Sequence, residues 1–296
     1  MTQDCSLIFT WWNTSLAPSA KARASEEERQ AACNIIRYLV EIKKSSFIAL
    51  GEMSKEDAEY LKEMCVIESY EYEVGVSRSG RSSFDTCYLY DASKIAIKHI
   101  SNIESQKGNS NKRIAQRVDL LVGKDLTPFH LFVSHWPSRL WCAEGDPNRH
   151  LYGIRLRDSI DDLIGEYTHP PHIMLLGDYN DDPFSDSLSQ HVMATRDFKL
   201  ASRKKDLFYN PFWKCLSQRQ WNRGCSGSYF YKSGQVTQWH TFDQIIFSHA
   251  FLRGDSWRLT QDFEHVVQIP GVIEVIRDND SIFDHIPVSG KIERVI

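Results

Sequence analysis

The sequence contains no segment that suggests export or a membrane span. Its first residues, MTQDCSLIFTWWN, carry no basic segment followed by a long apolar one, which is the pattern of a secretory signal. No apolar stretch approaches the roughly 20 residues that a helix needs to cross a bilayer. We therefore expect a cytoplasmic protein that does not insert into a membrane.

The sequence also lacks paired cysteines and an excess of positive charge. Its seven cysteines include no Cys-x-x-Cys pair, so neither a zinc site nor a disulfide framework is indicated, and we expect free thiols in a reducing compartment. The formal net charge is -4 and the pI is near 6.3. A polyanionic partner would therefore have to be bound by a local patch, because the protein as a whole would repel it.

No internal repeat and no linker rich in proline, glycine or serine divides the chain. Its 296 residues, 42% hydrophobic and 25% charged, have a composition that is ordinary for a globular protein. The polar stretch 105–117 is a candidate loop, but a loop of that length need not separate domains. We predict one domain that spans residues 1–296.

Strand-like runs outnumber helix-like ones. Short runs rich in apolar, β-branched and aromatic residues predict strands at 6–12, 46–51, 70–76, 85–91, 94–100, 117–123, 129–136, 172–178, 241–248 and 285–292. Capping boxes at Ser25 with Glu28 and at Ser54 with Asp57 predict two helices, and periodic stretches predict two more at 151–167 and 185–193. The residues expected to face inward include Ile35, Ile36, Leu39 and Ile42 in the first helix and Ile154, Ile160, Leu163 and Ile164 in the third. This α/β pattern favours two sheets packed face to face, with helices outside them.

Polar residues of types found in active sites stand at the ends of several strand-like runs. They are Asn13, Glu52, His135, Arg139, Asp178, Asn180, Asp284 and His285, with Asp243 at the start of a run. Each one alone is better explained as a turn residue, a cap, a surface carboxylate or a hydrogen-bonded histidine. Asp181 and Asp182 in particular suit caps of the turn and helix that follow them. Because strand ends can converge on one rim, however, the whole set predicts a binding site.

The motifs TWWN, GE, SHW, GDYN, FDQIIFS and DH occur in the order found in a known family. The sequence resembles the endonuclease/exonuclease/phosphatase superfamily, which includes pancreatic-type deoxyribonucleases, abasic-site endonucleases, inositol polyphosphate 5-phosphatases and neutral sphingomyelinases. The resemblance covers residues 7–288 and implies a four-layer α/β sandwich, in which helices flank two mainly antiparallel sheets. The sequence departs from the family at Gly51, where glutamine is usual, and at Phe283, where serine is usual.

The resemblance also implies a divalent metal ion, Mg²⁺, for which Mn²⁺ could substitute. Glu52 would be its principal ligand, with Asn13 and Asp284 close by. Independently of the family, hydrolysis of a phosphodiester calls for a hard cation with oxygen ligands, a base for the attacking water, and donors to the phosphoryl oxygens.

The remaining motif residues take catalytic roles by the same resemblance. Asp178 would orient and deprotonate the attacking water, and Asn180 would hold a phosphate oxygen. His285, steadied by Asp243, and His135 would donate hydrogen bonds to the non-bridging oxygens as negative charge develops there.

The segment 207–240 is dense in aromatic residues and carries Lys214, Arg219 and Arg223. Aromatic faces interleaved with cations suit stacked bases and a phosphate backbone, but the segment could equally be a long loop whose rings pack on the sandwich. The candidate substrate-binding residues are Arg139, Trp213, Trp221 and Arg223.

We expect a Mg²⁺-dependent nuclease that acts on DNA or RNA, so the expected partner is nucleic acid. The alternative is a phosphatase or phosphodiesterase for a small or lipid-linked phosphate, of the inositol phosphate or sphingomyelin type. An inactive binding module is the least favoured reading, because every assigned motif position keeps a chemically competent residue. The sequence indicates no protein partner.

Overall fold

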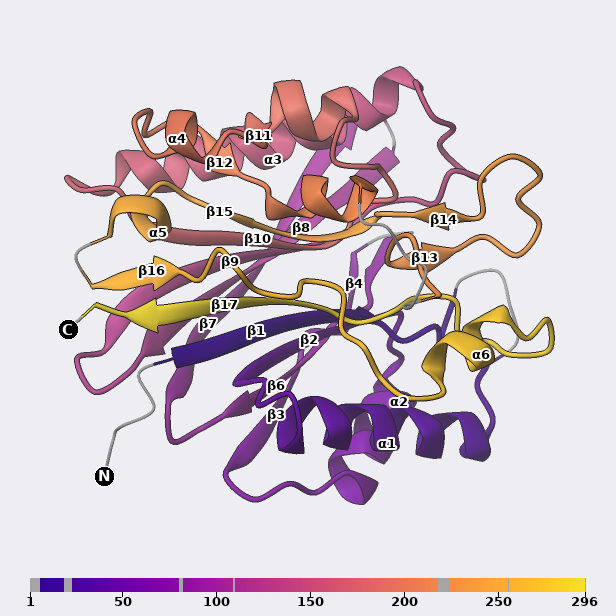
Figure 1. Ribbon diagram of the computed structural model, residues 1–296. Coiled ribbons are helices and arrows are strands. Elements are labelled where there is room, and N and C mark those ends of the chain that lie inside the picture. Colours follow the sequence, from indigo (N-terminus) through magenta and orange to yellow (C-terminus); the bar gives the residue numbers. More distant parts are fainter. Residues whose placement is uncertain are drawn as a thin grey trace.

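The computed structural model describes residues 6–18, 23–79, 82–108, 110–217, 224–254 and 256–295. Two sheets lie against each other in the middle of the molecule, and helices cover their outer faces (Figure 1). The predicted four-layer α/β sandwich is therefore confirmed.

The first sheet has six strands in the order β16-β17-β1-β2-β6-β3. In that order the strands are Trp257–Leu259, Val288–Arg294, Ser6–Asn13, Phe47–Gly51, Cys87–Asp91 and Tyr70–Val74. Strands β1 and β2 run parallel, and the other neighbours run antiparallel. The sheet is thus mainly antiparallel, with one parallel pair near its middle.

The second sheet has seven strands in the order β11-β12-β15-β10-β9-β8-β7. In that order they are Ala194–Thr195, Phe208–Tyr209, Asp243–Phe247, His172–Asp178, Thr127–His135, Ser110–Val122 and Ile95–Lys107. Its central pair, β9 and β10, is parallel, as is the short pair β11 and β12. Two small hairpins stand apart from both sheets: β4 (Ser77–Ser79) with β5 (Ser82–Phe84), and β13 (Tyr229–Phe230) with β14 (Trp239–His240).

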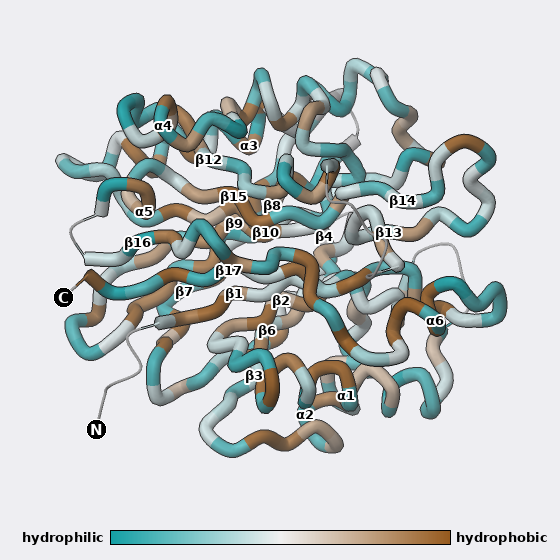
Figure 2. Tube along the Cα trace, in the orientation of Figure 1, coloured by the Kyte–Doolittle hydropathy of each residue, from teal (hydrophilic) through white to brown (hydrophobic). Residues whose placement is uncertain are grey.

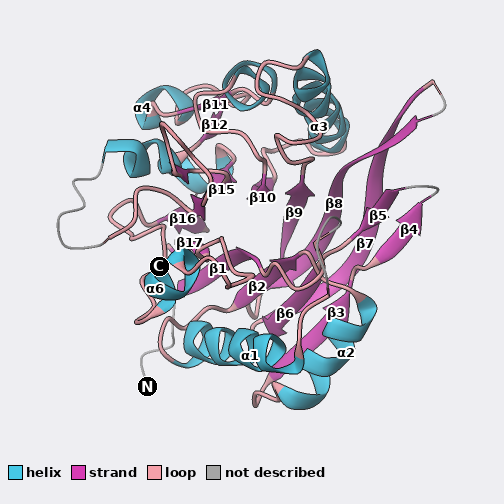
Figure 3. Cartoon of the chain, turned by 90° about the vertical axis from the view of Figure 1, so that its right-hand side faces the viewer, coloured by secondary structure: helices cyan, strands magenta, loops and turns pink. Residues whose placement is uncertain are grey.

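Helices α1 (Glu26–Glu41) and α2 (Lys55–Met64) cover the first sheet, and α3 (Pro147–Gly165) covers the second (Figures 1 and 3). The shorter helical segments are η1 (Ser187–His191), α4 (Phe198–Ala201), η2 (Pro211–Ser217), α5 (Ala250–Arg253) and α6 (Val272–Arg277). Both predicted capping boxes are present, at the starts of α1 and α2. No helix of the described residues is long and apolar enough to cross a bilayer.

Two residues predicted to face inward are exposed. Ile42 lies just after the last residue of α1 and is 62% exposed, and Ile154 in α3 is 39% exposed. The buried face of α3 contains Tyr152, Leu156 and Ile160, which are four residues apart. Because each residue turns a helix by about 100°, Ile154 lies on the side opposite Tyr152.

Strand β10 is apolar at nearly every position because both of its faces are buried. Met174 and Leu176 belong to the core that fills the space between the sheets, whereas Ile173 and Leu175 belong to the core beneath α3. Successive side chains of a strand point to opposite faces, so a strand buried on both faces needs apolar residues at every position. Figure 2 shows the same concentration of hydrophobic residues along the central strands.

The prediction of a loop at 105–117 was wrong. β7 continues to Lys107, β8 begins at Ser110, and these two residues pair, so most of the stretch is an antiparallel hairpin. The hairpin projects beyond the body of the sandwich (Figure 3). Strands that extend past the core have less apolar surface to cover, which explains why a polar sequence forms regular strands here.

Candidate active site

Each sheet has a central parallel strand pair whose two strands end at the same level. Asn13 ends β1 opposite Gly51 of β2, and Asp178 ends β10 opposite His135 of β9. The amide Nδ2 of Asn13 donates to Oδ2 of Asp178 at 3.2 Å, so these two edges meet. The strand register therefore brings motif residues from both sheets to one place, as the sequence predicted.

Two glycines allow the backbone and side chains to come this close. A Cβ on Gly177, whose φ is +153°, would lie 1.8 Å from the backbone oxygen of Ser134 in the neighbouring strand. A Cβ on Gly51 would lie 2.5 Å from the indole ring of Trp11. The departure from the family at Gly51 is thus matched by a large ring that fills the same space.

His285 and Asp243 form a buried pair, with 2.8 Å between Nδ1 and Oδ2. The indole Nε1 of Trp11 donates to the other carboxylate oxygen of Asp243 at 2.7 Å, and Nε1 of Trp12 donates to the backbone oxygen of His285 at 3.2 Å. Phe283, the second departure from the family, stacks on Trp12 with ring centroids 5.9 Å apart. Both tryptophans of the TWWN motif therefore hold this pair in place.

The imidazole of His285 is surrounded by acids. Its Nε2 lies 3.8 Å from an oxygen of Asp178 and 3.8 Å from an oxygen of Asp284. Burial is the largest influence on the pKa of His285 and would lower it. The Asp243 carboxylate, followed by Asp178 and Asp284, outweighs burial and raises the pKa to about 10. His285 is therefore a protonated hydrogen-bond donor at neutral pH.

A second imidazole–carboxylate pair joins His135 to Asp85, with 2.9 Å between Nδ1 and Oδ2. Asp85 also pairs with Arg113 at 2.8 Å, and Nε2 of His135 lies 3.8 Å from Oε1 of Glu52. Burial would lower the pKa of His135 and Arg113 also lowers it, but Asp85 outweighs both and raises it. Asp85 was not singled out from the sequence, although, like Asp243, it lies close to the start of a strand.

Asp178 is a buried carboxylate held by two donors. Its Oδ1 accepts from the backbone N–H of Asn180 at 2.8 Å, and its Oδ2 accepts from Asn13. Burial, and then the charge of Asp243, raise the pKa of Asp178, while His285 opposes the increase. A carboxylate with a raised pKa is a better proton acceptor than an ordinary aspartate, which suits a general base.

Asn180 and Arg139 are both engaged within the protein. Nδ2 of Asn180 donates to the backbone oxygen of Trp136 at 3.0 Å. Arg139 donates to the backbone oxygen of Asn180, to Asp182 and to Glu144, each at 3.1 Å. The guanidinium predicted to bind substrate therefore fixes the loop that follows β10.

The two neighbouring aspartates of this loop, Asp181 and Asp182, also have structural partners. Oδ2 of Asp181 accepts from the hydroxyl of Ser187, the first residue of η1, at 2.5 Å, and Oδ1 of Asp182 accepts from the backbone N–H of Thr241 at 2.9 Å. Asp181 also pairs with the buried Arg149 at 3.4 Å. Both aspartates are thus held within the protein, but not as the predicted caps, because η1 follows Asp186 and has no side-chain cap hydrogen bond.

Glu52 and Asp284 offer oxygen ligands at the mouth of the site. Their side chains remain 19% and 18% exposed, and Glu52 adopts a left-handed backbone with φ of +52°. Burial raises the pKa of Glu52, the charges of His135 and His285 oppose the increase, and those of Asp284 and Asp85 add to it. Partly exposed carboxylate oxygens at the mouth of a site fit a hard divalent cation.

Within the described residues, one group of three has ligand atoms within 4.8 Å of one another: Asp178, Asp243 and His285. His285 and Asp243 are already hydrogen-bonded to each other through Nδ1 and Oδ2. Glu52 and Asp284 remain partly exposed and add two further carboxylates to this group.

Tyr229 is a further residue at the site that sequence reasoning did not single out. Its ring centroid lies 4.6 Å from that of His285. Burial raises the pKa of its hydroxyl, and the charges of Asp284 and Asp178 raise it further, so the hydroxyl stays protonated. Its only signal in the sequence was membership of the aromatic segment 207–240.

Trp213 lies in η2, where its ring meets Phe184 edge-on and the guanidinium of Arg196 lies 5.2 Å from its centroid. None of these partners is a motif residue, so the contacts of Trp213 favour a packing role. Trp221 and Arg223 lie outside the described residues.

A family model described as "Endonuclease/Exonuclease/phosphatase family" matches residues 18–269. No curated protein matches the sequence closely enough to count as a relative. Among solved structures, the human Nocturnin catalytic domain with bound sulfate anion has a TM-score of 0.61 at 13% identity, covering 98% of this chain and 95% of that one.

Two further structures have the same fold, each with a TM-score of 0.58 and with 98% of this chain and 100% of the other covered. One is D. rerio TDP2 complexed with single strand DNA product, at 14% identity, and the other is a mannosyl-6-phosphatase of Bacteroides thetaiotaomicron VPI-5482, at 15% identity.

Proposed function

The chain belongs to the Endonuclease/Exonuclease/phosphatase family, and from this premise we propose that it is a Mg²⁺-dependent nuclease that hydrolyses phosphodiester bonds of DNA or RNA. Mn²⁺ would replace Mg²⁺, and residues 1–296 would form one catalytic domain. The observation that carries this proposal is the meeting of two imidazole–carboxylate pairs, a buried base and two further carboxylates at one edge of the paired sheets.

In the proposed mechanism, Asp178 accepts a proton from the attacking water, because burial raises its affinity for a proton. The Nδ1–H of His285 donates to Asp243 and that of His135 donates to Asp85, which leaves the Nε2–H of each ring to the substrate. These groups donate to the non-bridging oxygens as their negative charge grows.

Glu52 and Asp284, with Asn13, would hold the metal ion. When bound, the ion would stabilise negative charge on the phosphoryl and leaving-group oxygens. Asn180 supports the base through its backbone N–H, and its side chain retains one N–H for a phosphate oxygen, since the other donates to Trp136.

Two structural neighbours support different substrates. D. rerio TDP2 is described with a single strand DNA product, which supports nucleic acid, whereas the mannosyl-6-phosphatase supports the alternative of a small phosphate ester. The alternative therefore remains a phosphatase or phosphodiesterase for a small or lipid-linked phosphate, such as an inositol phosphate or sphingomyelin.

A substrate panel would test the proposal. Purified protein with Mg²⁺ would be assayed on plasmid DNA, single-stranded DNA, RNA, inositol phosphates and sphingomyelin, with Asp178→Asn as the inactive control. We expect cleavage of a nucleic acid, loss of turnover in EDTA, and recovery with Mg²⁺ or Mn²⁺. Full activity in EDTA after dialysis would exclude the metal-dependent mechanism, and hydrolysis of inositol phosphates alone would establish the alternative.

A further inference from the structure

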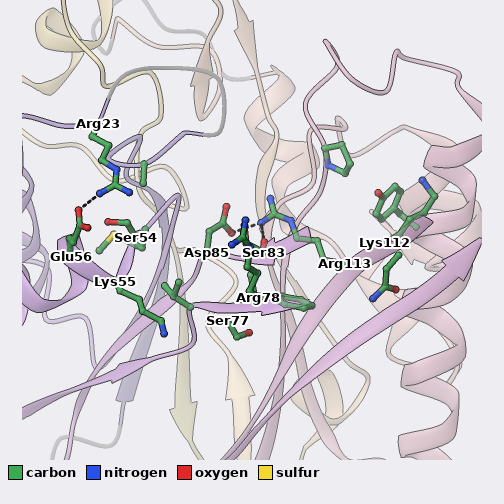
Figure 4. A pocket seen from close by; sticks show the side chains of 17 residues that line it. Arg23, Ser54, Lys55, Glu56, Ser77, Arg78, Ser83, Asp85, Lys112 and Arg113 are labelled. Carbon is green, nitrogen blue, oxygen red and sulfur yellow. Dashed lines mark hydrogen bonds and ion pairs between the residues drawn. The ribbon is translucent and has the colours of Figure 1, made fainter. Parts of the chain in front are cut away.

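A cavity of about 860 Å³ opens beside the pair of His135 and Asp85 (Figure 4). Helix α2, the hairpin β4–β5 and the start of β8 contribute to its wall. The cavity is lined by five basic side chains, those of Arg23, Lys55, Arg78, Lys112 and Arg113. It is lined by two carboxylates, those of Glu56 and Asp85. The cavity is therefore a positively charged region of a protein whose formal net charge is -4.

Both carboxylates of the cavity are already paired. Asp85 binds Arg113 at 2.8 Å, and Glu56 binds Arg23. In the part of the chain that the structure describes, no ion pair neutralises the other three cations, which are Lys55, Arg78 and Lys112. In Figure 4, Arg78 lies between Lys55 and Lys112, so these three charges are spread along the cavity.

The cavity is connected to the catalytic residues by direct contacts. Asp85 lines it and binds His135, whose other ring nitrogen lies 3.8 Å from Glu52. The backbone N–H of Met53, also in the lining, donates to the backbone oxygen of Asp85 at 2.9 Å. A substrate whose scissile phosphate meets His135 would therefore place its next groups in this cavity.

We propose that Lys55, Arg78 and Lys112 bind the phosphates that flank the scissile bond of a single nucleic-acid strand. This inference rests on the proposed function and adds to it that the cavity binds a single strand beyond the scissile bond. A choline headgroup is cationic and would be repelled by these charges. The volume lies within the roughly 300–1,000 Å³ typical of ligand pockets. Lysine and arginine side chains spaced along a groove are the usual means of following a phosphate backbone.

The rings of the cavity indicate that this contact does not distinguish bases. Phe84 and Tyr152 are both buried, at 3% and 4% exposure, and Nζ of Lys112 lies 5.4 Å from the ring centroid of Tyr152. Neither ring is free to stack on a base. The cavity would therefore bind the backbone through charge and would show little sequence preference.

The test compares two charge-matched triple variants. The first replaces Lys55, Arg78 and Lys112 by glutamine, and the control replaces Lys199, Arg203 and Lys204 by glutamine. The control residues are exposed and lie at or next to α4, at the opposite end of the molecule from α2 and β4 (Figure 1). Both variants lose the same net charge, so only the position of the charges differs.

Three substrates separate binding along the cavity from catalysis. They are a labelled single-stranded octanucleotide, a dinucleotide with a single phosphodiester, and the chromogenic diester bis(p-nitrophenyl) phosphate. For the cavity variant we expect kcat/KM on the octanucleotide to fall about 10-fold or more, with changes within about twofold on the other two substrates. The slope of log(kcat/KM) against log[salt] should decrease by about 2, since each phosphate contact on a single strand contributes about 0.7. The control should behave as the unmodified protein.

The proposed role of the cavity would be overturned if kcat/KM fell equally in the two triple variants, or equally on all three substrates. Hydrolysis by the unmodified protein would still uphold the proposed function in that case. If the unmodified protein hydrolysed none of the substrates, the proposed function would fail instead. Fluorescence anisotropy of the labelled octanucleotide in EDTA then tests, independently of hydrolysis, whether the cavity binds it. Weaker binding by the cavity variant than by the control supports it, and equal binding overturns it. Melting curves identify any variant that fails to fold.

Discussion

The two imidazole–carboxylate pairs occupy the same edge of the molecule but differ in what surrounds them. Asp243 shares its carboxylate between His285 and the neutral indole N–H of Trp11, whereas Asp85 shares its carboxylate between His135 and the cationic Arg113. An indole donor orients the carboxylate without reducing its charge. A guanidinium competes with the imidazole for that charge.

These different surroundings act on the pKa of each imidazole. The pKa of His285 is raised to about 10, because the carboxylates of Asp243, Asp178 and Asp284 outweigh the opposite effect of burial. The pKa of His135 is also raised, but Arg113 works against the increase. His285 therefore stays protonated at neutral pH, and His135 is tied to the basic cavity through Asp85 and Arg113.

The largest expected effect is the loss of kcat when one of the two histidines is replaced by alanine. His285→Ala should lower kcat by on the order of 10²-fold or more, because it removes a donor that acts mainly in the transition state. His135→Ala should cost less, about 10-fold, because Arg113 remains near the same position and can still supply positive charge. Steady-state kinetics on one phosphodiester measures both. Equal losses would mean that the different surroundings of the two pairs do not matter for turnover.

A smaller effect is expected when the pair of His285 and Asp243 stays in place but loses one supporting hydrogen bond. Trp11→Phe deletes the N–H that holds Asp243 and should lower kcat several-fold to about 10-fold, with KM little changed, because the carboxylate is then less well oriented. Trp12→Phe is the matched control, since its N–H contacts only the backbone oxygen of His285.

If Trp11→Phe and Trp12→Phe lower kcat equally and in proportion to a drop in melting temperature, the role of Trp11 is packing alone. The pH dependence of kcat separates these outcomes further, because only a change at Asp243 should alter it.

The smallest expected effect concerns the half-buried imidazole of His172 and the buried imidazole of His265, neither of which pairs with a carboxylate of the described residues. Burial lowers the pKa of His172 and of His265 from the usual value of 6.5 to about 4. Between these values the unfolded chain binds protons that the folded protein does not, so the free energy of unfolding should fall as the pH decreases from 6.5 to 4. Urea unfolding at pH 7 and pH 5 measures this. His265→Gln should reduce the fall, and an unchanged fall would show that His265 does not contribute.

Local patterns were sufficient to predict the elements that carry the site. Ser25 with Glu28 and Ser54 with Asp57 form the capping boxes that the sequence indicated, and the run before Asp178 is the buried strand. A capping box and a strand depend on residues that are near in sequence, so periodicity and spacing reveal them. The α/β class and the order of the motifs followed from the same information.

Local sequence patterns thus predict which residues end the strands, whereas the partners of those residues depend on how distant elements pack. Asp85, Trp11 and Arg113 come from separate segments, and contacts between the two sheets and their loops make them partners of His135 and Asp243. The assembly of Lys55, Arg78 and Lys112 into one cavity is of the same kind. The partners of Arg139 are likewise set by the tertiary structure, because its guanidinium donates to the backbone oxygen of Asn180 and to the carboxylate of Asp182. Such pairings depend on the packing of elements far apart in the chain, which local periodicity does not encode.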